Sequence, residues 1–174
     1  MQPVMDNTIK ALKTAIQMEV DGKEFYLKAA QASRNNLGKK LLNQLAAEED
    51  IHRQVFENIY NSLGKNEGWP EVHIKPDSSL KTILSGARNE IAGDTSVIKE
   101  EIDAVETAMG LENKTFDYYR GQAKSAGLSQ EKQFYEALAS QEEEHHRVLL
   151  SYYEFLKDPE AWFVQAEHPS LDGG

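Results

Sequence analysis

Two copies of the pattern Glu-x-x-His stand in this sequence, each inside a long segment that is predicted to be helical. The first copy is Glu49 with His52, and the second is Glu142 with His145. Residues three apart lie on the same face of a helix, so each pair directs one carboxylate and one imidazole the same way. Such side chains are oxygen and nitrogen donors for iron, manganese and similar cations. A single Glu-x-x-His is weak evidence, but two in matching positions indicate a metal site.

An internal repeat relates the two copies. Shifting the chain by 93 residues aligns residues 15–60 with residues 108–153 without a gap, and eleven of the forty-six positions are identical. Besides both members of each Glu-x-x-His, the identities include Glu19 with Glu112 and Tyr26 with Tyr119. The halves are therefore copies of one supersecondary unit.

The prolines predict where that unit begins and ends. They stand at positions 3, 70, 76, 159 and 169, and so leave two long stretches free of the residue that interrupts helices. Within these stretches apolar residues recur at steps of three and four, the period of an amphipathic helix. We predict helices over about 7–33, 39–63, 78–91, 95–126 and 130–157, with a break at 92–95.

These elements predict an all-α protein with one domain over residues 1–174. Two helical hairpins, about 7–63 and 94–157, are joined by a link over 64–93 that contains a short extra helix, and a tail follows over 158–174. A link this long allows a crossover, which is found in one class of four-helix bundles.

The acidic and imidazole side chains fall on the apolar faces of these helices. In the second long helix, Leu45, Glu49, His52 and Phe56 form one row of steps of three and four. Glu19 and Glu112 occupy the corresponding rows of the first and third long helices. Since 30 residues separate Glu19 from Glu49, and again Glu112 from Glu142, four glutamates and two histidines are expected in one layer of the core.

Burying four carboxylates together is unfavourable by roughly several kcal/mol unless their charge is compensated. Two divalent cations would balance the four negative charges while both imidazoles stay neutral. The donor set of oxygen and nitrogen favours two iron ions, with manganese as the alternative.

Composition excludes several other kinds of site. The chain has no cysteine, which rules out disulfides, thiolate zinc sites and iron–sulfur clusters. Its 19 basic and 29 acidic side chains give a net charge of −10, so nucleic acid and membrane surfaces are not expected partners. No apolar run approaches the length of a membrane span, and residues 1–7 do not resemble a signal peptide, so we expect a cytoplasmic protein.

Paired glutamates together with paired Glu-x-x-His on four helices resemble the ferritin-like diiron carboxylate proteins. The resemblance is closest to the diiron domain of rubrerythrin, and it extends from about residue 5 to residue 163. It is carried by Met18-Glu19, Glu48-Glu49-Asp50-Ile51-His52, Leu111-Glu112, Gln141-Glu142-Glu143-Glu144-His145, and Asp158-Pro159-Glu160-Ala161-Trp162-Phe163.

This resemblance implies a ferritin-like four-helix bundle and assigns the metal ligands. They would be Glu19, Glu49, His52, Glu112, Glu142 and His145. Tyr26 and Tyr119 resemble the tyrosines that, in this family, hydrogen-bond to the ligating carboxylates. Glu48, Glu143 and Glu144 are expected on solvated helix faces.

The sequence departs from typical rubrerythrins in two ways. It has no four-cysteine rubredoxin domain, so electrons are expected from a separate donor such as a rubredoxin-type protein. Thr115 stands where rubrerythrins carry an additional glutamate, which puts the family's iron movement during peroxide turnover in doubt. The remaining ligand set is more symmetric, as in bacterioferritin-type sites.

The leading hypothesis is reduction of hydrogen peroxide by a rubrerythrin-like peroxidase, and the family also suggests a homodimer. A ferroxidase that handles iron, an oxygenase that activates O₂ toward an organic substrate, and a metal-free interaction bundle are the alternatives.

Overall fold

Residues 3–75, 78–90 and 99–167 are described by a computed structural model, and this part of the chain contains helices and no strand. The helices are α1 (Pro3–Ala32), α2 (Asn36–Gly64), α3 (Ser79–Glu90), α4 (Lys99–Ser125), α5 (Ser129–Lys157) and α6 (Pro159–Glu167). The predicted all-α class is therefore confirmed.

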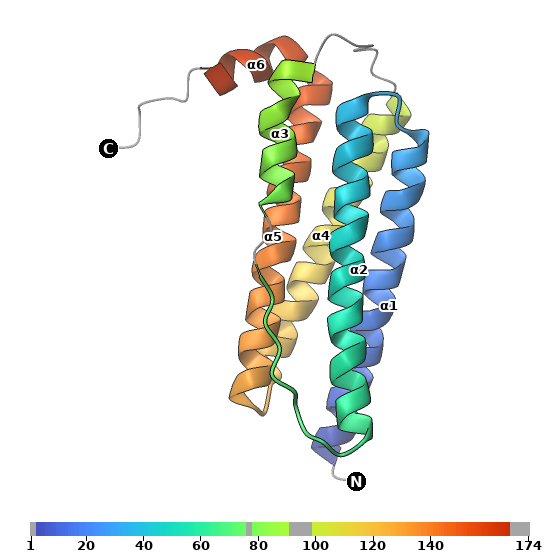
Figure 1. The fold of residues 1–174 in the computed structure, drawn as a ribbon, viewed down its shortest axis with the longest axis vertical. Helices are drawn as coiled ribbons and strands as arrows, with labels where there is room; N and C mark the ends of the chain where they lie inside the picture. The colour runs from blue at the N-terminus through green and yellow to red at the C-terminus, as the bar shows by residue number, and fades with distance from the viewer. Residues whose placement is uncertain (1–2, 76–77, 91–98, 168–174) are drawn as a thin grey trace, which may run out of the picture.

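The four long helices form two antiparallel hairpins that face each other (Figure 1). α1 packs along α2 and α4 packs along α5, while the short α3 lies against both α2 and α5. The link after α2 runs back along the bundle to α3, so that α2 and α4 run in the same direction (Figure 1). This crossover arrangement confirms the predicted ferritin-like bundle.

The starts of α1 and α2 and the tail differ from the prediction, and α1 begins at Pro3 instead of near residue 7. α2 begins before Gly38 because the side chain of Asn35 caps it, accepting a hydrogen bond from the Gly38 amide at 2.6 Å. The tail was not predicted to be helical, yet it contains α6. Pro159 is well suited to a first helical position, and Asp158 Oδ1 accepts from the Ala161 amide at 3.0 Å. The predicted break at 92–95 lies outside the described residues.

Gly38 is required where the α1–α2 turn meets the second hairpin. A Cβ atom there would collide with the Tyr152 hydroxyl, the Ser33 hydroxyl and a carboxylate oxygen of Glu101. These groups are already joined, since Tyr152 donates to Glu101 at 2.8 Å and Ser33 also donates to that carboxylate. The turn therefore docks through a buried polar cluster that leaves no room for a methyl group.

We expect Gly38→Ala to lower the free energy of unfolding by about 1–3 kcal/mol, the usual effect of overpacking a core. Chemical denaturation measures this. Gly86→Ala in α3 is the matched control, since a Cβ there meets nothing within 4 Å. Equal stability of Gly38→Ala and the wild type would contradict the close approach.

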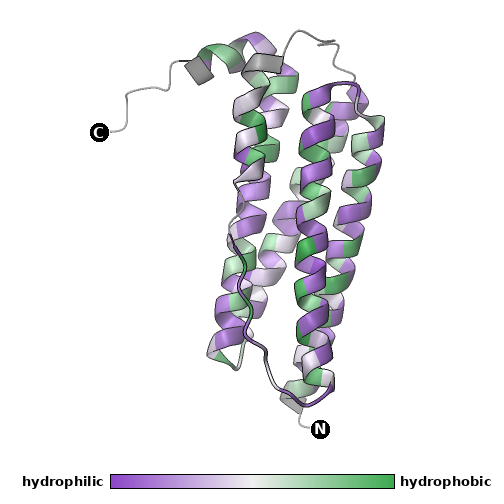
Figure 2. Cartoon of the chain, in the orientation of Figure 1, coloured by the Kyte–Doolittle hydropathy of each residue, from purple (hydrophilic) through white to green (hydrophobic). Residues whose placement is uncertain are grey.

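The core consists of two apolar clusters at different heights in the bundle. One contains Leu41, Leu45 and Leu149, and the other contains Phe56 and Leu138. Each long helix carries both hydrophobic and hydrophilic residues (Figure 2), as expected for helices with one face in a core. Between the two clusters lies a layer of buried glutamates and histidines.

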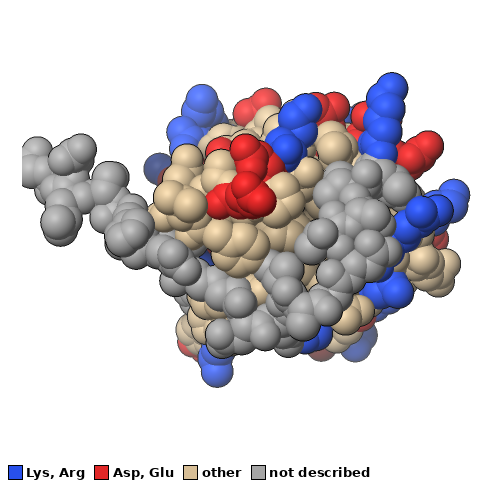
Figure 3. Space-filling view, turned by 90° about the horizontal axis from the view of Figure 1, so that it is seen from above, with Lys and Arg blue, Asp and Glu red and all other residues tan. Residues whose placement is uncertain are grey.

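The surface is charged and mixed in sign. Seen from the end that carries α6, basic and acidic side chains intermingle over the visible described surface (Figure 3). Within the described ranges, no helix combines the length and the apolar character that crossing a bilayer requires.

Candidate metal centre

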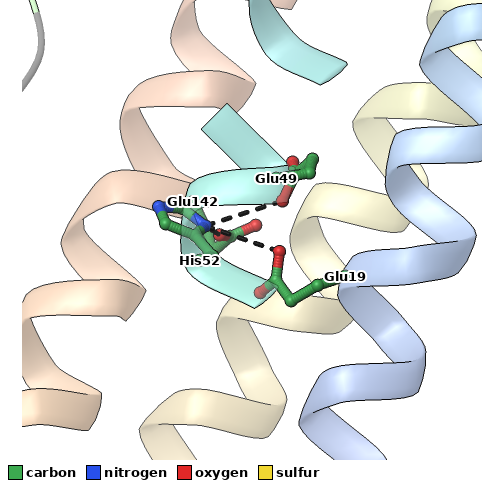
Figure 4. Close-up of side chains that lie close together, drawn as sticks. All are labelled: Glu19, Glu49, His52 and Glu142. Carbon is green, nitrogen blue, oxygen red and sulfur yellow. Dashed lines mark ion pairs between the residues drawn. The ribbon is translucent and has the colours of Figure 1, made fainter. Parts of the chain in front are cut away.

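Six buried side chains from four helices meet in the layer between the apolar clusters. They are Glu19 from α1, Glu49 and His52 from α2, Glu112 from α4, and Glu142 and His145 from α5. None is more than 3% exposed. Figure 4 shows four of them converging from three helices. The structure thus brings together every residue that the sequence assigned to the metal site.

The six residues form two groups of four that share two members. Glu19, Glu49, His52 and Glu142 make one group, and Glu49, Glu112, Glu142 and His145 make the other. Within each group the potential ligand atoms all lie within 4.8 Å of one another. That span is about twice the ~2.0–2.4 Å bond that divalent cations form with oxygen and nitrogen, so each group has the size of a cation site.

Both imidazoles present Nδ1 to the carboxylates. His52 Nδ1 lies 3.2 Å from Glu142, 3.5 Å from Glu19 and 3.6 Å from Glu49. His145 Nδ1 lies 3.3 Å from Glu49 and 3.5 Å from Glu112. Glu49 directs Oε2 toward His52 and Oε1 toward His145. A carboxylate oriented in this way is suited to bridge two cations.

The other ring nitrogen of each histidine contacts a residue of the opposite hairpin. His145 Nε2 lies 2.7 Å from Glu48, and His52 Nε2 lies 2.5 Å from Gln141. The assignment of Glu48 to a solvated face is therefore wrong, because it is 6% exposed and reaches across the bundle. The sequence did contain a hint of this role, because Glu48 directly precedes Glu49 and the equivalent residue of the repeat, Gln141, directly precedes Glu142. Glu143, by contrast, is exposed.

The inward-facing atoms have unmet bonding capacity. Five of them have no hydrogen-bond partner among the described residues, namely Glu19 Oε2, His52 Nδ1, Glu112 Oε2, Glu142 Oε1 and His145 Nδ1. Buried polar atoms are nearly always paired, and a role in binding an ion is one reason for an exception. The residues present therefore fit a metal centre.

The buried side chains of the cluster strongly shift one another's pKa values. Burial, and then the charge of Glu49, raise the pKa of Glu19 from 4.5 to about 8. Burial and the surrounding carboxylates also raise the pKa of Glu142 well above 4.5. Burial alone would lower the pKa of His52 and His145, but the facing carboxylates outweigh it and raise both well above 6.5. Bound protons thus partly compensate the buried negative charge.

Two buried tyrosines hold carboxylates of the opposite half. Tyr26 donates to Glu112, and Tyr119 donates to Glu19. Burial, together with these carboxylates, raises the pKa of both hydroxyls well above 10, which keeps them protonated as donors. Such contacts would fix the orientation of a ligating carboxylate.

A small cavity of about 70 Å³ opens onto the cluster between α1 and α4. Gly22 and Thr115, which are equivalent positions of the repeat, both line it. The Thr115 hydroxyl donates to its own helix, at the Leu111 carbonyl oxygen 2.9 Å away. The cavity has room for about two water-sized molecules.

The family model described as Rubrerythrin matches residues 10–109, which is more than half of the chain. The match includes Glu19, Glu49 and His52 and ends before Glu112, so it is narrower than the resemblance over residues 5–163. No significant match to a curated protein or to a solved structure accompanies it.

Proposed function

Because the chain belongs to the rubrerythrin family, whose domain implies a diiron carboxylate protein, we propose that it reduces hydrogen peroxide to water at a two-iron centre. The observation that carries the proposal is the pair of buried four-residue groups that share Glu49 and Glu142. Two overlapping groups are suited to two neighbouring cations, as in enzymes whose paired metals act on one substrate.

We propose Glu19, Glu49, His52, Glu112, Glu142 and His145 as the iron ligands. Two iron ions, when bound, would supply the two electrons that break the O–O bond. Each peroxide also takes up two protons, and two water molecules leave. An electron donor such as a rubredoxin-type protein is proposed to restore the reduced state.

The chain's own residues would position and protect this reaction. Tyr26 and Tyr119 hold one oxygen of Glu112 and of Glu19, leaving the other oxygen of each directed inward. The apolar clusters on either side of the layer exclude water from its ends. The 70 Å³ cavity suits peroxide or O₂ better than an organic substrate, which favours the peroxidase over an oxygenase.

The test is stopped-flow mixing of the reduced, iron-loaded protein with hydrogen peroxide and, in parallel, with O₂. We expect the reaction with peroxide to be the faster of the two. A reaction with peroxide no faster than that with O₂ would rule out the peroxidase assignment.

A ferroxidase is the second candidate, and the Thr115 position favours it. Thr115 adds no carboxylate to the cluster, because its hydroxyl bonds to its own helix. Each of the two four-residue groups therefore consists of three glutamates and one histidine, as the repeat predicts. A ferroxidase would oxidise successive additions of Fe²⁺ with O₂ and pass the product on. Rapid multiple turnover of excess Fe²⁺, together with a slow peroxide reaction, would select this function.

Gly22→Leu should obstruct the cavity. A Cβ at this position is in ordinary contact with Glu49, 3.6 Å from its Cγ, and the longer side chain of leucine would extend into the opening. We expect peroxide to react about 10- to 100-fold more slowly, because the leucine side chain would displace peroxide from its reacting position, and small displacements of reacting groups have effects of this size.

The matched control for this variant is Gly110→Leu on α4, where a Cβ meets nothing within 4 Å. Iron content is measured in both variants, so that slower chemistry is distinguished from metal loss. An unchanged rate in iron-loaded Gly22→Leu would show that peroxide enters elsewhere.

A further inference from the structure

The two halves of the centre differ at the pair of equivalent positions that contacts the histidines. Residues 48 and 141 are 93 apart and correspond in the repeat, but the first is glutamate and the second is glutamine. Each lies next to the histidine of the opposite hairpin. The six proposed ligands and their tyrosine partners are symmetric, whereas the partners of the two histidines are not.

Both contacts are made to Nε2, the nitrogen that faces away from the carboxylate layer. Glu48 Oε2 lies 2.7 Å from His145 Nε2, and Gln44 donates to the other oxygen of Glu48 at 3.3 Å. Gln141 Oε1 lies 2.5 Å from His52 Nε2. The amide nitrogen of Gln141 donates to the Lys75 carbonyl oxygen at 3.2 Å, which fixes the amide orientation.

Both partner atoms are oxygens that accept hydrogen bonds, so each histidine donates from Nε2 and directs the lone pair of Nδ1 toward the carboxylates. This is the form in which an imidazole binds a cation. The two hydrogen bonds differ in strength, because a carboxylate acceptor gives a bond roughly twice as strong as a neutral amide does. A carboxylate partner also makes the imidazole a stronger donor to the metal.

We propose that Glu48 is a positioning residue that makes the two metal positions unequal. The position built on His145 and Glu112 binds a divalent cation more tightly and fills first, while the position built on His52 and Glu19 is the weaker one. The inference rests on the proposed function, because it requires that both four-residue groups bind a cation. It adds the order in which the two positions bind their cations, which the six ligands alone do not determine.

The test exchanges the two residues. The apoprotein is titrated with Co²⁺ under calorimetric and visible-absorption readout, for the wild type, Glu48→Gln, Gln141→Glu and the double exchange. We expect two resolved steps in the wild type. Glu48→Gln should weaken the tighter binding step about tenfold, and Gln141→Glu should strengthen the weaker step about tenfold. Loss of a hydrogen-bond partner of a metal ligand usually lowers metal affinity by about 10- to 100-fold, and we expect the lower end of that range.

The double exchange should restore two separated steps, because each half again has a different acceptor. A merely structural role would not produce opposite effects in the single variants or recovery in the double one. Thermal melts of the apoproteins show whether each variant is folded.

Two results would overturn the inference alone. These are two equal steps in the wild type, or shifts of both steps in the same direction in Glu48→Gln and Gln141→Glu. A wild-type protein that bound no Co²⁺ would instead overturn the metal centre itself, and the inference with it, so the two failures are distinguishable.

Discussion

Glu142→Ala is expected to reduce the metal content from two ions per chain to one or none. Glu142 belongs to both groups of four, so its removal leaves only three potential ligands in each. Loss of a partner outside the ligand set already weakens metal binding by about 10- to 100-fold, and loss of a shared ligand should exceed the upper end of that range. Elemental analysis after anaerobic loading with Fe²⁺ measures the result.

Glu143→Ala is the matched control, since this neighbouring glutamate is exposed and pairs with Arg147 at 3.0 Å on the outside of α5. It should retain the metal content of the wild type. Two ions per chain in Glu142→Ala, or equal losses in both variants, would refute the ligand assignment.

The same substitution should stabilise the metal-free protein above neutral pH. Burial makes ionisation of Glu142 unfavourable, as the raised pKa of this carboxyl shows. Removing an uncompensated buried charge relieves that destabilisation. If Glu142→Ala loses metal but has a more stable apoprotein, Glu142 is retained for metal binding and not for stability.

The second large effect concerns pH. The metal-free protein should lose stability as the pH rises from about 4.5 to about 8. Over this interval Glu19 is largely protonated when folded and largely ionised when unfolded, because burial and Glu49 raise its folded pKa to about 8. The folded state then binds more protons than the unfolded state, so the free energy of unfolding falls with rising pH.

Glu142, His52 and His145, whose pKa values are also raised, act in the same direction over this interval. The pKa of His52 is raised by the surrounding carboxylates despite its burial, so the stability that it contributes is present below pH 6.5 and is lost at higher pH. The pKa of Glu49 is lowered, since hydrogen bonds with its neighbours outweigh burial. The stability due to Glu49 is therefore lost as the pH falls below about 4.5, outside the interval.

Melting temperatures across this interval, with and without metal, measure the effect. Glu19→Gln removes one titrating group. It should reduce the slope of the apoprotein's free energy of unfolding against pH by at most about 1.4 kcal/mol per pH unit. Bound cations displace the protons, so the loaded protein should be the more stable form at pH 8, by about 2.7 kcal/mol at a metal concentration 100 times Kd. An apoprotein whose stability rises steadily through the interval would contradict the buried, uncompensated carboxylates.

Local patterns in the sequence were enough to predict the helices and the inward row of each. Helix periodicity is a property of neighbouring residues, so the steps of three and four placed Glu49 and His52 in the core without knowledge of the partner helices. The repeat then placed Glu142 and His145 in the same way. The α6 helix was missed because a nine-residue helix after Pro159 carries little periodic signal.

The sequence by itself determined which six side chains face inward, and their heights along the bundle. Only the tertiary structure decided that Glu49 and Glu142 are shared between the two groups, that Tyr26 pairs with Glu112, and that Glu48 reaches His145. All of these relations cross from one hairpin to the other. They depend on the rotation and offset of one hairpin against its partner, which are set by packing between residues far apart in the chain and not by the periodicity of a single helix.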